Sequence, residues 1–280
     1  MKLRLVARWT LATLLLVIAL LWLADRIWPL PLPKDDLARV VLAEDGTPLW
    51  RFADANGVWR YPVQTSEVSP YYLDAVLTYE DRWFYQHPGV NPLALARATW
   101  QNLTGARVVS GGSTLSMQVA RLLDPHSRTF HGKLRQLWRT AQLEWHLSKE
   151  QILNLYLNRA PFGGTLQGVA AASWAYLGKS PAQLTHAEAA LLAVLPQAPS
   201  RLRPDRHPQR AQQARDKVLR RLAEFKVWPQ SAVDEALEEP LLLAPRLEPS
   251  LAPLLARRLN RPDSPPLIRT TVDATLQRRL

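Results

Sequence analysis

The chain has 280 residues, 47% of them hydrophobic and 21% charged, so it is long enough to bury the core of one or two domains. Lys and Arg number 35 against 24 Asp and Glu, a formal net charge of +11, which favours anionic partners such as nucleic acid, acidic lipid or a phosphorylated substrate. No cysteine is present, which excludes disulfides and thiolate metal sites but fits any compartment.

The N-terminal segment is strongly apolar. Residues 9–24 read WTLATLLLVIALLWLA and carry no charge, and basic residues precede them. This stretch is slightly shorter than the ~20 residues that cross a bilayer, but Trp9 and Trp28 can lie at the two interfaces and lengthen it. The pattern therefore predicts a transmembrane anchor at 9–28.

A cleaved signal peptide is the alternative interpretation of this segment. Trp22 and Ala24 fit the small-x-small cleavage pattern poorly, which favours an uncleaved anchor. Because basic residues precede the anchor, residues 1–8 are expected in the cytoplasm and everything after Asp25 on the outer side of the membrane. That orientation disfavours nucleic acid as the partner of the basic domain.

A β-hairpin and a helix are predicted next. After a Pro-rich spacer at 29–34, two β-type runs flank an Asp-Gly turn, which predicts a hairpin over about 39–52. Ser69 is followed by proline, a typical helix start, and this helix is expected to end at His87 because a proline follows it.

The rest of the body is predicted to be helical. A second helix is expected after Gly111 and Gly112, with Ser113 as its cap, and Ser148 with Gln151 forms a capping box at the start of another. Further helices are predicted at about 133–147, 167–177, 185–195 and 207–225, with a loop at 161–165. From Pro240 proline recurs every few residues through PPLI at 265–268, which predicts a linker rather than a packed domain there.

The stretch EDRWFYQHPG at 80–89 is the first candidate site. On a continuous helix, Glu80, Phe84 and His87 share one face. A carboxylate beside three aromatic residues is partly desolvated, and this raises its pKa towards the value that a general acid or base needs near neutral pH. The alternative is an ordinary helix end at which Glu80 and Asp81 are solvated and the rings belong to the core.

The stretch SGGSTLSMQVAR at 110–121 is the second candidate. A glycine pair precedes a helix N-terminus, and Thr114, Gln118 and Arg121 follow at helical spacing. Backbone N–H groups and the helix dipole attract phosphate there, and Arg121 adds a charge-assisted contact. A glycine pair before a helix is common, so this stretch alone does not establish a site.

The predicted helix at 133–147 has two distinct faces. Its polar face carries Lys133, Gln136, Thr140 and Glu144, and its apolar face carries Leu134, Leu137, Trp138, Ala141 and Trp145. Taken alone, the polar face is expected to be solvated.

Four motifs occur in order along the chain: EDRWFYQHPG; GGSTLSMQ; KLRQ followed by SKEQILNLYLN; and HAEAALLAVLPQAPS. Together they resemble the glycosyltransferase domain of class A penicillin-binding proteins, the peptidoglycan glycosyltransferases of family 51. The resemblance covers about 34–230, and NRAPFGGTLQG and LPQAPSRLRPDR look closest to the branch called 1C. It implies a mainly α, lysozyme-like fold with a membrane-embedded jaw subdomain, preceded by one transmembrane helix and a short β-hairpin.

The resemblance also implies a reaction. Family members polymerise lipid II outside the cytoplasmic membrane, and Glu80 matches their catalytic glutamate, which takes the proton from the acceptor sugar's 4-hydroxyl. Attack on the donor's anomeric carbon with inversion gives a β-1,4 bond and releases a lipid pyrophosphate. The implied site-shaping residues are Asp81, Phe84, His87 and Gln136. The implied substrate and pyrophosphate contacts are Ser113, Thr114, Gln118, Arg121, Lys133 and Arg135.

Some residues depart from the family pattern. Gln136 stands where a second glutamate is usual, and glutamine cannot ionise or act as a carboxylate ligand. Met117 and Asn154 replace a family glutamine and glutamate, and Arg121 replaces a lysine, which is a mild change. Glu144 is not expected to substitute for the missing carboxylate, because eight helical residues place it ~12 Å further along the axis, and a structural role is predicted for it.

Cofactors and partners follow from the same resemblance. Use of a divalent cation, Mg or Mn, varies in the family, and the absence of a carboxylate at Gln136 disfavours a tight metal site, so no metal ligand is assigned. The expected partners are lipid II, the growing lipid-linked glycan, the cytoplasmic membrane and cell-wall synthesis proteins.

The sequence at 268–280 resembles the opening of the transpeptidase domain of class A proteins. No catalytic serine motif of that domain is present. The chain is therefore expected to be the N-terminal part of a bifunctional enzyme, or a truncated product, without transpeptidase activity.

Two other functions stay open at this point. Gln136, Asn154 and the truncation are compatible with a catalytically weak, membrane-anchored scaffold that binds lipid II or wall enzymes. A lone glutamate in a lysozyme-like fold is also compatible with a lytic enzyme. The anchor and the phosphate-suited second motif disfavour the lytic function, because cleavage of finished glycan needs neither.

Overall fold

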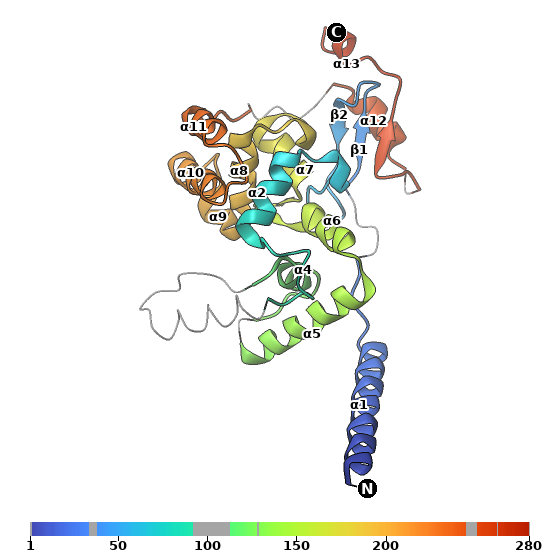
Figure 1. Ribbon diagram of the computed structural model, residues 1–280. Helices are drawn as coiled ribbons and strands as arrows, with labels where there is room; N and C mark the ends of the chain where they lie inside the picture. Colours follow the sequence, from blue (N-terminus) through green and yellow to red (C-terminus); the bar gives the residue numbers. More distant parts are fainter. Residues whose placement is uncertain are drawn as a thin grey trace.

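The computed structural model describes residues 2–33, 38–91, 113–127, 129–244, 251–261 and 263–279. Helix α1, Lys2–Ile27, projects from the body as a separate rod (Figure 1). Its segment Arg8–Ile27 is long and apolar enough to cross a membrane by length and composition, with a mean hydropathy of 1.9, and none of it is buried against the rest of the chain. This agrees with the anchor predicted at 9–28.

The body is built mainly from helices. They are α2 Pro70–Glu80, α4 Leu115–Leu123, α5 Phe130–His146, α6 Lys149–Arg159, α7 Val169–Ala172, α8 His186–Val194, α9 Pro199–Leu202, α10 Pro208–Glu224 and α11 Gln230–Glu238. Helix α8 is almost entirely buried, and α2 and α10 pack against it. Its four small alanines let these neighbours approach closely, so α8 forms the centre of the main hydrophobic core.

Several predicted elements are confirmed. The capping box at the start of α6 forms as expected, since Gln151 N donates to Ser148 Oγ at 3.2 Å and Ser148 N donates to Gln151 Oε1 at 2.8 Å. Helices α8 and α10 each lie within one residue, at either end, of the predicted ranges. The cap of α4 differs from the prediction: Thr114, not Ser113, accepts the bond from Met117 N.

The prediction that the first helix reaches His87 is wrong. Helix α2 ends at Glu80, and Asp81 takes an extended φ of −159°. The Asp81 carboxylate accepts bonds from His87 and from Leu115 N, groups that a continued helix would not bring to it. Residues 81–89 therefore form a series of turns, and Glu80, Phe84 and His87 do not share a helix face.

The expectation of a solvated polar face on α5 is also wrong. Gln136 and Thr140 are 5% and 0% exposed, whereas Leu134 and Trp145 are 50% and 56% exposed. The polar face packs against α4, where hydrogen-bond partners from other segments satisfy it. The apolar face of α5 thus lies at the surface, together with Phe130 at the helix start.

Helix α5 also holds the end of the anchor. Gln142 Nε2 donates to Asp25 Oδ1 at 2.8 Å and to Trp28 O at 2.7 Å, and His146 Nε2 lies 3.0 Å from the Asp25 carboxylate. Arg139 Nη1 donates to the carbonyl oxygens of Trp28 and Pro29 at 3.0 and 2.9 Å. These bonds satisfy two carbonyl groups of the segment that directly follows α1 and fix that segment against α5.

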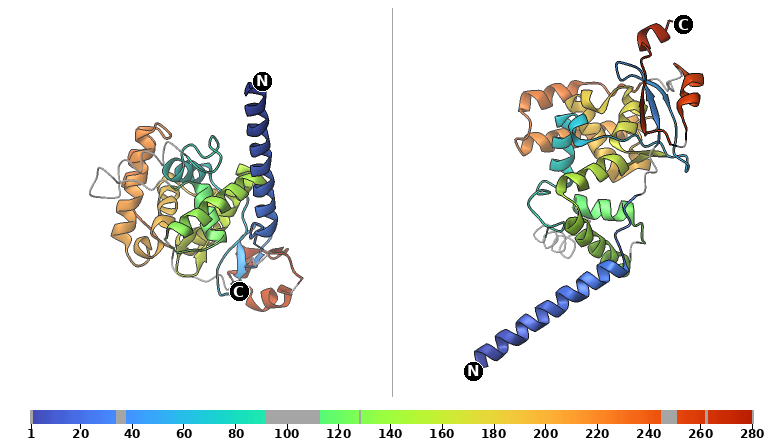
Figure 2. Two further views of the ribbon diagram at one scale, coloured as in Figure 1. Left: turned by 90° about the horizontal axis from the view of Figure 1, so that it is seen from below. Right: turned by 90° about the vertical axis from the view of Figure 1, so that its right-hand side faces the viewer.

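A small sheet lies at the end of the body away from the N-terminus (Figures 1 and 2). Strands β1, Val40–Leu42, and β2, Pro48–Arg51, form the predicted hairpin. Strand β5, Leu267–Arg269, adds to β1 in parallel, and helices α12, Pro253–Leu259, and α13, Ala274–Gln277, accompany it. A second core forms there from Val41, Ala43, Leu49, Ala252, Ala256 and Ala274.

This packing contradicts the prediction that the Pro-rich segment from 240 to about 268 is a linker rather than packed structure, over its described residues 251–261 and 263–268. Proline does not oppose it, because Pro253 occupies the first position of α12, where no N–H is needed. In place of the loop predicted at 161–165, strands β3, Pro161–Gly163, and β4, Leu166–Gln167, form a short hairpin.

Candidate functional site

The carboxylate of Glu80 lies where three separate segments meet. It stands at the last position of α2, and Gln118 of α4 donates from Nε2 to Glu80 Oε2 at 2.7 Å. Gln197, in the turn after α8, donates from Nε2 to Glu80 Oε1 at 2.9 Å. Two amides therefore hold the two carboxylate oxygens, which fixes the carboxylate plane without neutralising its charge.

Burial raises the pKa of Glu80 above its ordinary value. The two amide bonds from Gln118 and Gln197 oppose this shift, the negative charge of Asp81 adds to it, and Arg221 opposes it weakly. The net direction is upward, so Glu80 is a stronger base than an exposed glutamate. A carboxylate in this condition is suited to take a proton from a hydroxyl group near neutral pH.

Asp81 and His87 form a buried pair beside Glu80. His87 Nε2 lies 2.9 Å from Asp81 Oδ1, and Leu115 N donates to Asp81 Oδ2 at 2.9 Å. Both side chains are less than 10% exposed. The Asp81 carboxylate lies at the N-terminus of α4, where the helix dipole favours a negative charge. The pair therefore ties the end of α2 to α4, and with it the position of Glu80.

Thr114 and Phe84 make further contacts around the turns at 81–89. The Thr114 hydroxyl caps α4 and donates to Gly89 O, which closes the turns after α2. Phe84 is buried, and Lys149 Nζ lies 4.6 Å from its ring centroid while donating to His87 O at 2.7 Å. Ser113, predicted as a substrate contact, is half-buried and forms no hydrogen bond with the described residues.

Glu144 and Asn154 have structural partners. Glu144 Oε1 accepts bonds from Ser116 Oγ at 2.5 Å and Lys149 Nζ at 2.8 Å, in agreement with its predicted structural role. Asn154 Oδ1 accepts from Thr65 N at 2.9 Å and Thr65 Oγ1 at 2.8 Å. These contacts engage both side chains in tertiary packing.

Gln136 is held as an amide by its surroundings. Its Nε2 donates to Met117 O at 2.7 Å, and its Oε1 accepts from Lys133 Nζ at 3.2 Å. A carboxylate in the same place would turn an acceptor towards the Met117 carbonyl oxygen, which is itself an acceptor. The glutamine at this position therefore fits the local structure, and it links α5 to α4 close to Gln118.

The three predicted cations differ in their surroundings. Arg135 is paired with Asp124, with Nη2–Oδ1 at 2.6 Å and Nε–Oδ2 at 2.8 Å, and Asp124 also binds Arg139. Burial, followed by the nearby charge of Arg121, lowers the pKa of Lys133. Neither Lys133 nor Arg121 forms an ion pair with a described carboxylate. These two positive charges are therefore the ones available to an anion.

Some predictions fall outside the described residues or stay open. Gly111 and Gly112 lie in 92–112, which the structure does not describe. Within the described ranges, no group of three or more His, Asp or Glu could hold a metal ion. Use of Mg or Mn remains a prediction.

Gln197 is the residue that sequence reasoning missed. It belongs to the fourth motif, HAEAALLAVLPQAPS, to which no function was assigned. Only the fold brings it to Glu80, which lies 117 positions earlier in the chain. The match of its motif was the signal that could have identified it.

Comparisons with known proteins point in one direction. The family model described as Transglycosylase matches residues 45–223. The chain is 67% identical over 259 residues to penicillin-binding protein 1C of Escherichia coli (strain K12), covering 92% of this chain and 34% of that protein. It is 37% identical over 183 residues to penicillin-binding protein 1A of Aquifex aeolicus, covering 65% of this chain and 25% of that protein.

A solved structure of penicillin-binding protein 1A from Haemophilus influenzae also matches, with a TM-score of 0.44 and 22% identity, over 87% of this chain and 28% of that one. The chain thus spans about a third or less of the length of these relatives.

Proposed function

Because the chain belongs to the transglycosylase family, we propose that it is a peptidoglycan glycosyltransferase that polymerises lipid II into β-1,4-linked glycan. The observation that carries this proposal is the carboxylate of Glu80, held by Gln118 and Gln197 in a setting that raises its pKa. No other described carboxylate has its two oxygens bound by two side-chain amides from different segments.

Glu80 acts as the general base in this proposal. It takes the proton from the 4-hydroxyl of the acceptor sugar while that oxygen attacks the anomeric carbon of the donor. The bond from that carbon to the lipid pyrophosphate breaks on the opposite side, so the configuration inverts. One Glu80 oxygen must exchange an amide partner for the hydroxyl, and the exposed Gln197 is the partner that can withdraw.

The leaving pyrophosphate needs positive charge. Arg121 and Lys133 supply it, since neither is paired with a described carboxylate and their mutual repulsion is relieved by a bound anion. The N-terminus of α4 contributes less than the sequence suggested, because Leu115 N is bound to Asp81 and Met117 N to Thr114. Arg135 acts indirectly, through its pair with Asp124.

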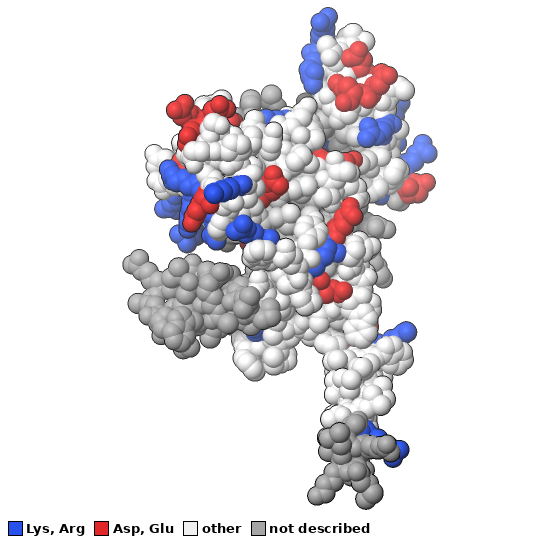
Figure 3. All heavy atoms as spheres, viewed as in Figure 1, with Lys and Arg blue, Asp and Glu red and all other residues white. Residues whose placement is uncertain are grey.

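The membrane holds the enzyme beside its lipid substrate in this proposal. Helix α1 crosses the cytoplasmic (inner) membrane once, with the N-terminus in the cytoplasm and the catalytic body on the periplasmic or extracellular side. The exposed apolar side chains Phe130, Leu134 and Trp145 enter the outer leaflet as the jaw. Figure 3 supports this arrangement: the lower body and α1 show few charges, while charged residues gather on the upper body.

One assay tests the function: the full chain in detergent micelles with labelled lipid II, beside a Glu80→Gln variant. We expect polymer from the unaltered chain and a rate about 10²- to 10⁴-fold lower from Glu80→Gln. Glu150→Gln removes an exposed carboxylate from α6 and is the matched control, for which the rate should stay unchanged.

Two other outcomes would overturn the proposal. Binding of lipid II without polymer, unaffected by Glu80→Gln, would favour the membrane-anchored scaffold, the alternative that the uncharged Gln136 supports. Shortening of preformed glycan would indicate a lytic enzyme.

A further inference from the structure

The short hairpin of β3 and β4 packs against the turn that carries Gln197. Strand β3 contacts both the turn Leu195–Gln197 and helix α9, which begins two residues after Gln197. Gln197 donates to Glu80 Oε1 at 2.9 Å, so the position of this turn determines whether the bond forms. Strand β3 is therefore a second support of the turn, besides the end of α8.

Gly163, at the end of β3, allows this close contact. Its φ is +113°, a conformation that residues with a side chain rarely adopt. A Cβ at this position would lie 2.6 Å from Arg203 Cγ, 2.9 Å from Arg203 Cδ and 3.2 Å from Pro199 O. The backbone of β3 thus lies directly on the Arg203 side chain and on the carbonyl group of Pro199, two residues after Gln197.

The Arg203 side chain is held in place. Its Nε donates to Asp205 Oδ1 at 2.9 Å and its Nη2 donates to Asp205 Oδ2 at 2.6 Å. This two-bond pair is largely shielded from solvent, since the arginine side chain is 17% exposed. A side chain added at Gly163 would therefore push against a fixed neighbour, and the displacement would pass to Pro199 and Gln197.

The hairpin itself is anchored to the helical body and to the chain that precedes α2. Tyr176 Oη donates to Phe162 O at 2.9 Å. Trp59 N donates to Thr165 O at 2.9 Å, and Gln167 N donates to Trp59 O at 3.0 Å. Strand β3 is therefore a fixed support for the turn at 195–197.

We propose that Gly163 and Arg203 are positioning residues, which hold the Gln197 amide against Glu80 through the turn at 195–197. The inference rests on the proposed function, in which Glu80 is the base. Glu80 accepts its side-chain hydrogen bonds from two amides, and neither of these belongs to β3 or to Arg203. Both positioning residues therefore act on Glu80 through Gln197.

Loss of the Gln197 bond has a specific effect on the chemistry. This bond lowers the pKa of Glu80 and so opposes the effect of burial. Without the bond the pKa of Glu80 rises further, and a smaller fraction of the base is ionised at neutral pH. The midpoint of the pH profile of kcat/KM, which reports on the free enzyme, should then move to higher pH.

The test is the pH profile of lipid II polymerisation by the full chain in detergent micelles, for Gln197→Ala, Gly163→Ala and the double variant. We expect each single variant to lower kcat/KM at neutral pH by about 10-fold and to move the midpoint to higher pH. The double variant should be no slower than the slower single variant, because both changes remove the same contact.

Arg203 offers two further variants that add no backbone strain. Arg203→Ala removes the side chain that lies on Gly163 and should show the same shift of the midpoint. Arg203→Lys keeps the aliphatic part of that side chain and should retain most of the rate. If Gly163→Ala does not fold, as thermal unfolding will show, these two variants decide the question.

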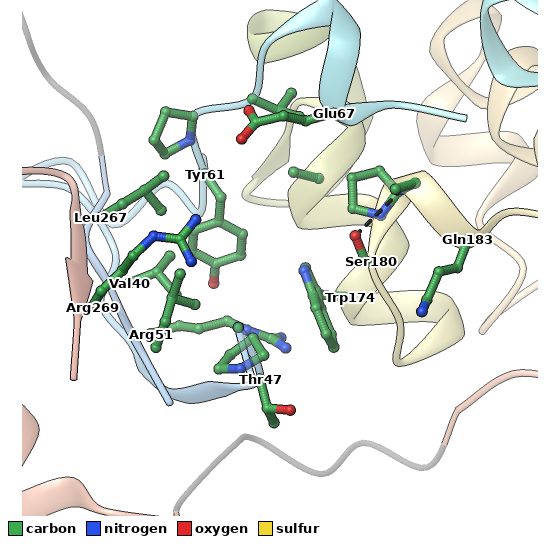
Figure 4. Close-up of a pocket in the computed structure, with 18 of the residues that line it drawn as sticks. Val40, Thr47, Arg51, Tyr61, Glu67, Trp174, Ser180, Gln183, Leu267 and Arg269 are labelled. Atoms are coloured by element: carbon green, nitrogen blue, oxygen red, sulfur yellow. Dashed lines mark hydrogen bonds between the residues drawn. The ribbon is translucent and has the colours of Figure 1, made fainter. Parts of the chain in front are cut away.

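Gly46→Ala is the matched control. Gly46 also has a positive φ, +82°, but a Cβ there would meet nothing within 4 Å. Gly46 lines a cavity of about 470 Å³ between the small sheet and the helical body (Figure 4), and no residue of β3, α9 or the turn at 195–197 lines that cavity. The variant should leave both the rate and the midpoint unchanged.

An unchanged midpoint in Arg203→Ala and in a folded Gly163→Ala would overturn the inference, because general damage to the fold lowers the rate without changing the pKa of the base. Losses in Gly163→Ala and Gln197→Ala that multiply in the double variant would overturn it as well. Glu80→Gln separates these results from the proposed function. If Glu80→Gln polymerises at the full rate, the proposed function fails; if it is inactive while the midpoints stay unchanged, only the positioning role fails.

Discussion

The ends of α1 and α2 each place an aspartate against a histidine, in very different surroundings. At the end of α2, Asp81 and His87 are both buried, and the backbone of α4 donates a further bond to Asp81. At the end of α1, Asp25 faces His146, whose side chain is 42% exposed. The same two residue types are thus a fixed part of the interior in one region and a solvent-screened contact in the other.

Burial determines how much each pair contributes to the free energy of unfolding. An exposed ion pair contributes about 0–1 kcal/mol, because water and salt screen it. Removing one partner of a buried, hydrogen-bonded pair costs roughly 3 kcal/mol, because the other partner stays desolvated without its bond. The pair near Glu80 should therefore hold the site rigidly, whereas the pair near the anchor allows movement.

The largest expected effect follows from Asp81→Ala. Loss of this carboxylate leaves both His87 and Leu115 N without their acceptor in the interior. We expect the free energy of unfolding in micelles to fall by roughly 3 kcal/mol, measured by denaturant titration. Asp81→Asn keeps one acceptor oxygen and should cost less. A loss below ~1 kcal/mol for Asp81→Ala would erase the distinction between the two pairs.

Gln136→Glu tests a second buried polar side chain, which lies on α5 and bonds to α4. A carboxylate there would face the Met117 carbonyl oxygen, so we expect a loss of about 1–3 kcal/mol in unfolding free energy and no gain in polymerisation rate. Gln209→Glu, at an exposed position of α10, is the control and should be neutral. A faster variant would show instead that a second carboxylate assists the reaction.

The pH dependence of the unfolding free energy and of the polymerisation rate should reveal the raised pKa of Glu80. Its pKa is raised on folding, so between its unfolded and folded values the folded state binds more protons. The free energy of unfolding should therefore fall as pH rises through that window, by less than the 1.4 kcal/mol per pH unit that one proton allows. Polymerisation should rise with pH over the same window, because the base must be ionised.

Both pH profiles should change in Glu80→Gln. The fall in unfolding free energy over that window should be missing from the variant, since its side chain does not titrate. If the variant keeps the same slope, another group is responsible.

The smallest effect is expected at the anchor. His146→Gln keeps a donor towards Asp25 and should change the free energy of unfolding by less than about 1 kcal/mol, at low and at high salt. A loss comparable to that of Asp81→Ala would show that the anchor contact is as firmly held as the site.

Local signals predicted much of this molecule correctly. The Asp-Gly turn specified the hairpin of β1 and β2, and the Ser148–Gln151 capping box specified the start of α6. These features depend on residues close in sequence, because the hydrogen bonds that form them lie within a single turn of the chain. The motif at 80–89 predicted Glu80 as the catalytic base, and this stays a prediction, while the structure shows that burial raises the pKa of this residue.

Tertiary contacts account for the predictions that were wrong. Helix α2 ends at Glu80 because Asp81 bonds to Leu115 N, a partner 34 residues away. The polar face of α5 is buried because it packs against α4, where Met117 O accepts a hydrogen bond from Gln136. Strand β5 pairs with β1 across more than 220 residues, which no local pattern of prolines reveals.

Arg139 gives the anchor a mechanical role. Its guanidinium binds the last carbonyl groups of the anchor region at Trp28 and Pro29, and also Asp124 at the end of α4. Gln118, which donates a hydrogen bond to Glu80, lies on that same α4, so α1 and Glu80 are connected through a short series of side-chain contacts. The position of α4, and with it that of Gln118, is therefore tied to the end of α1.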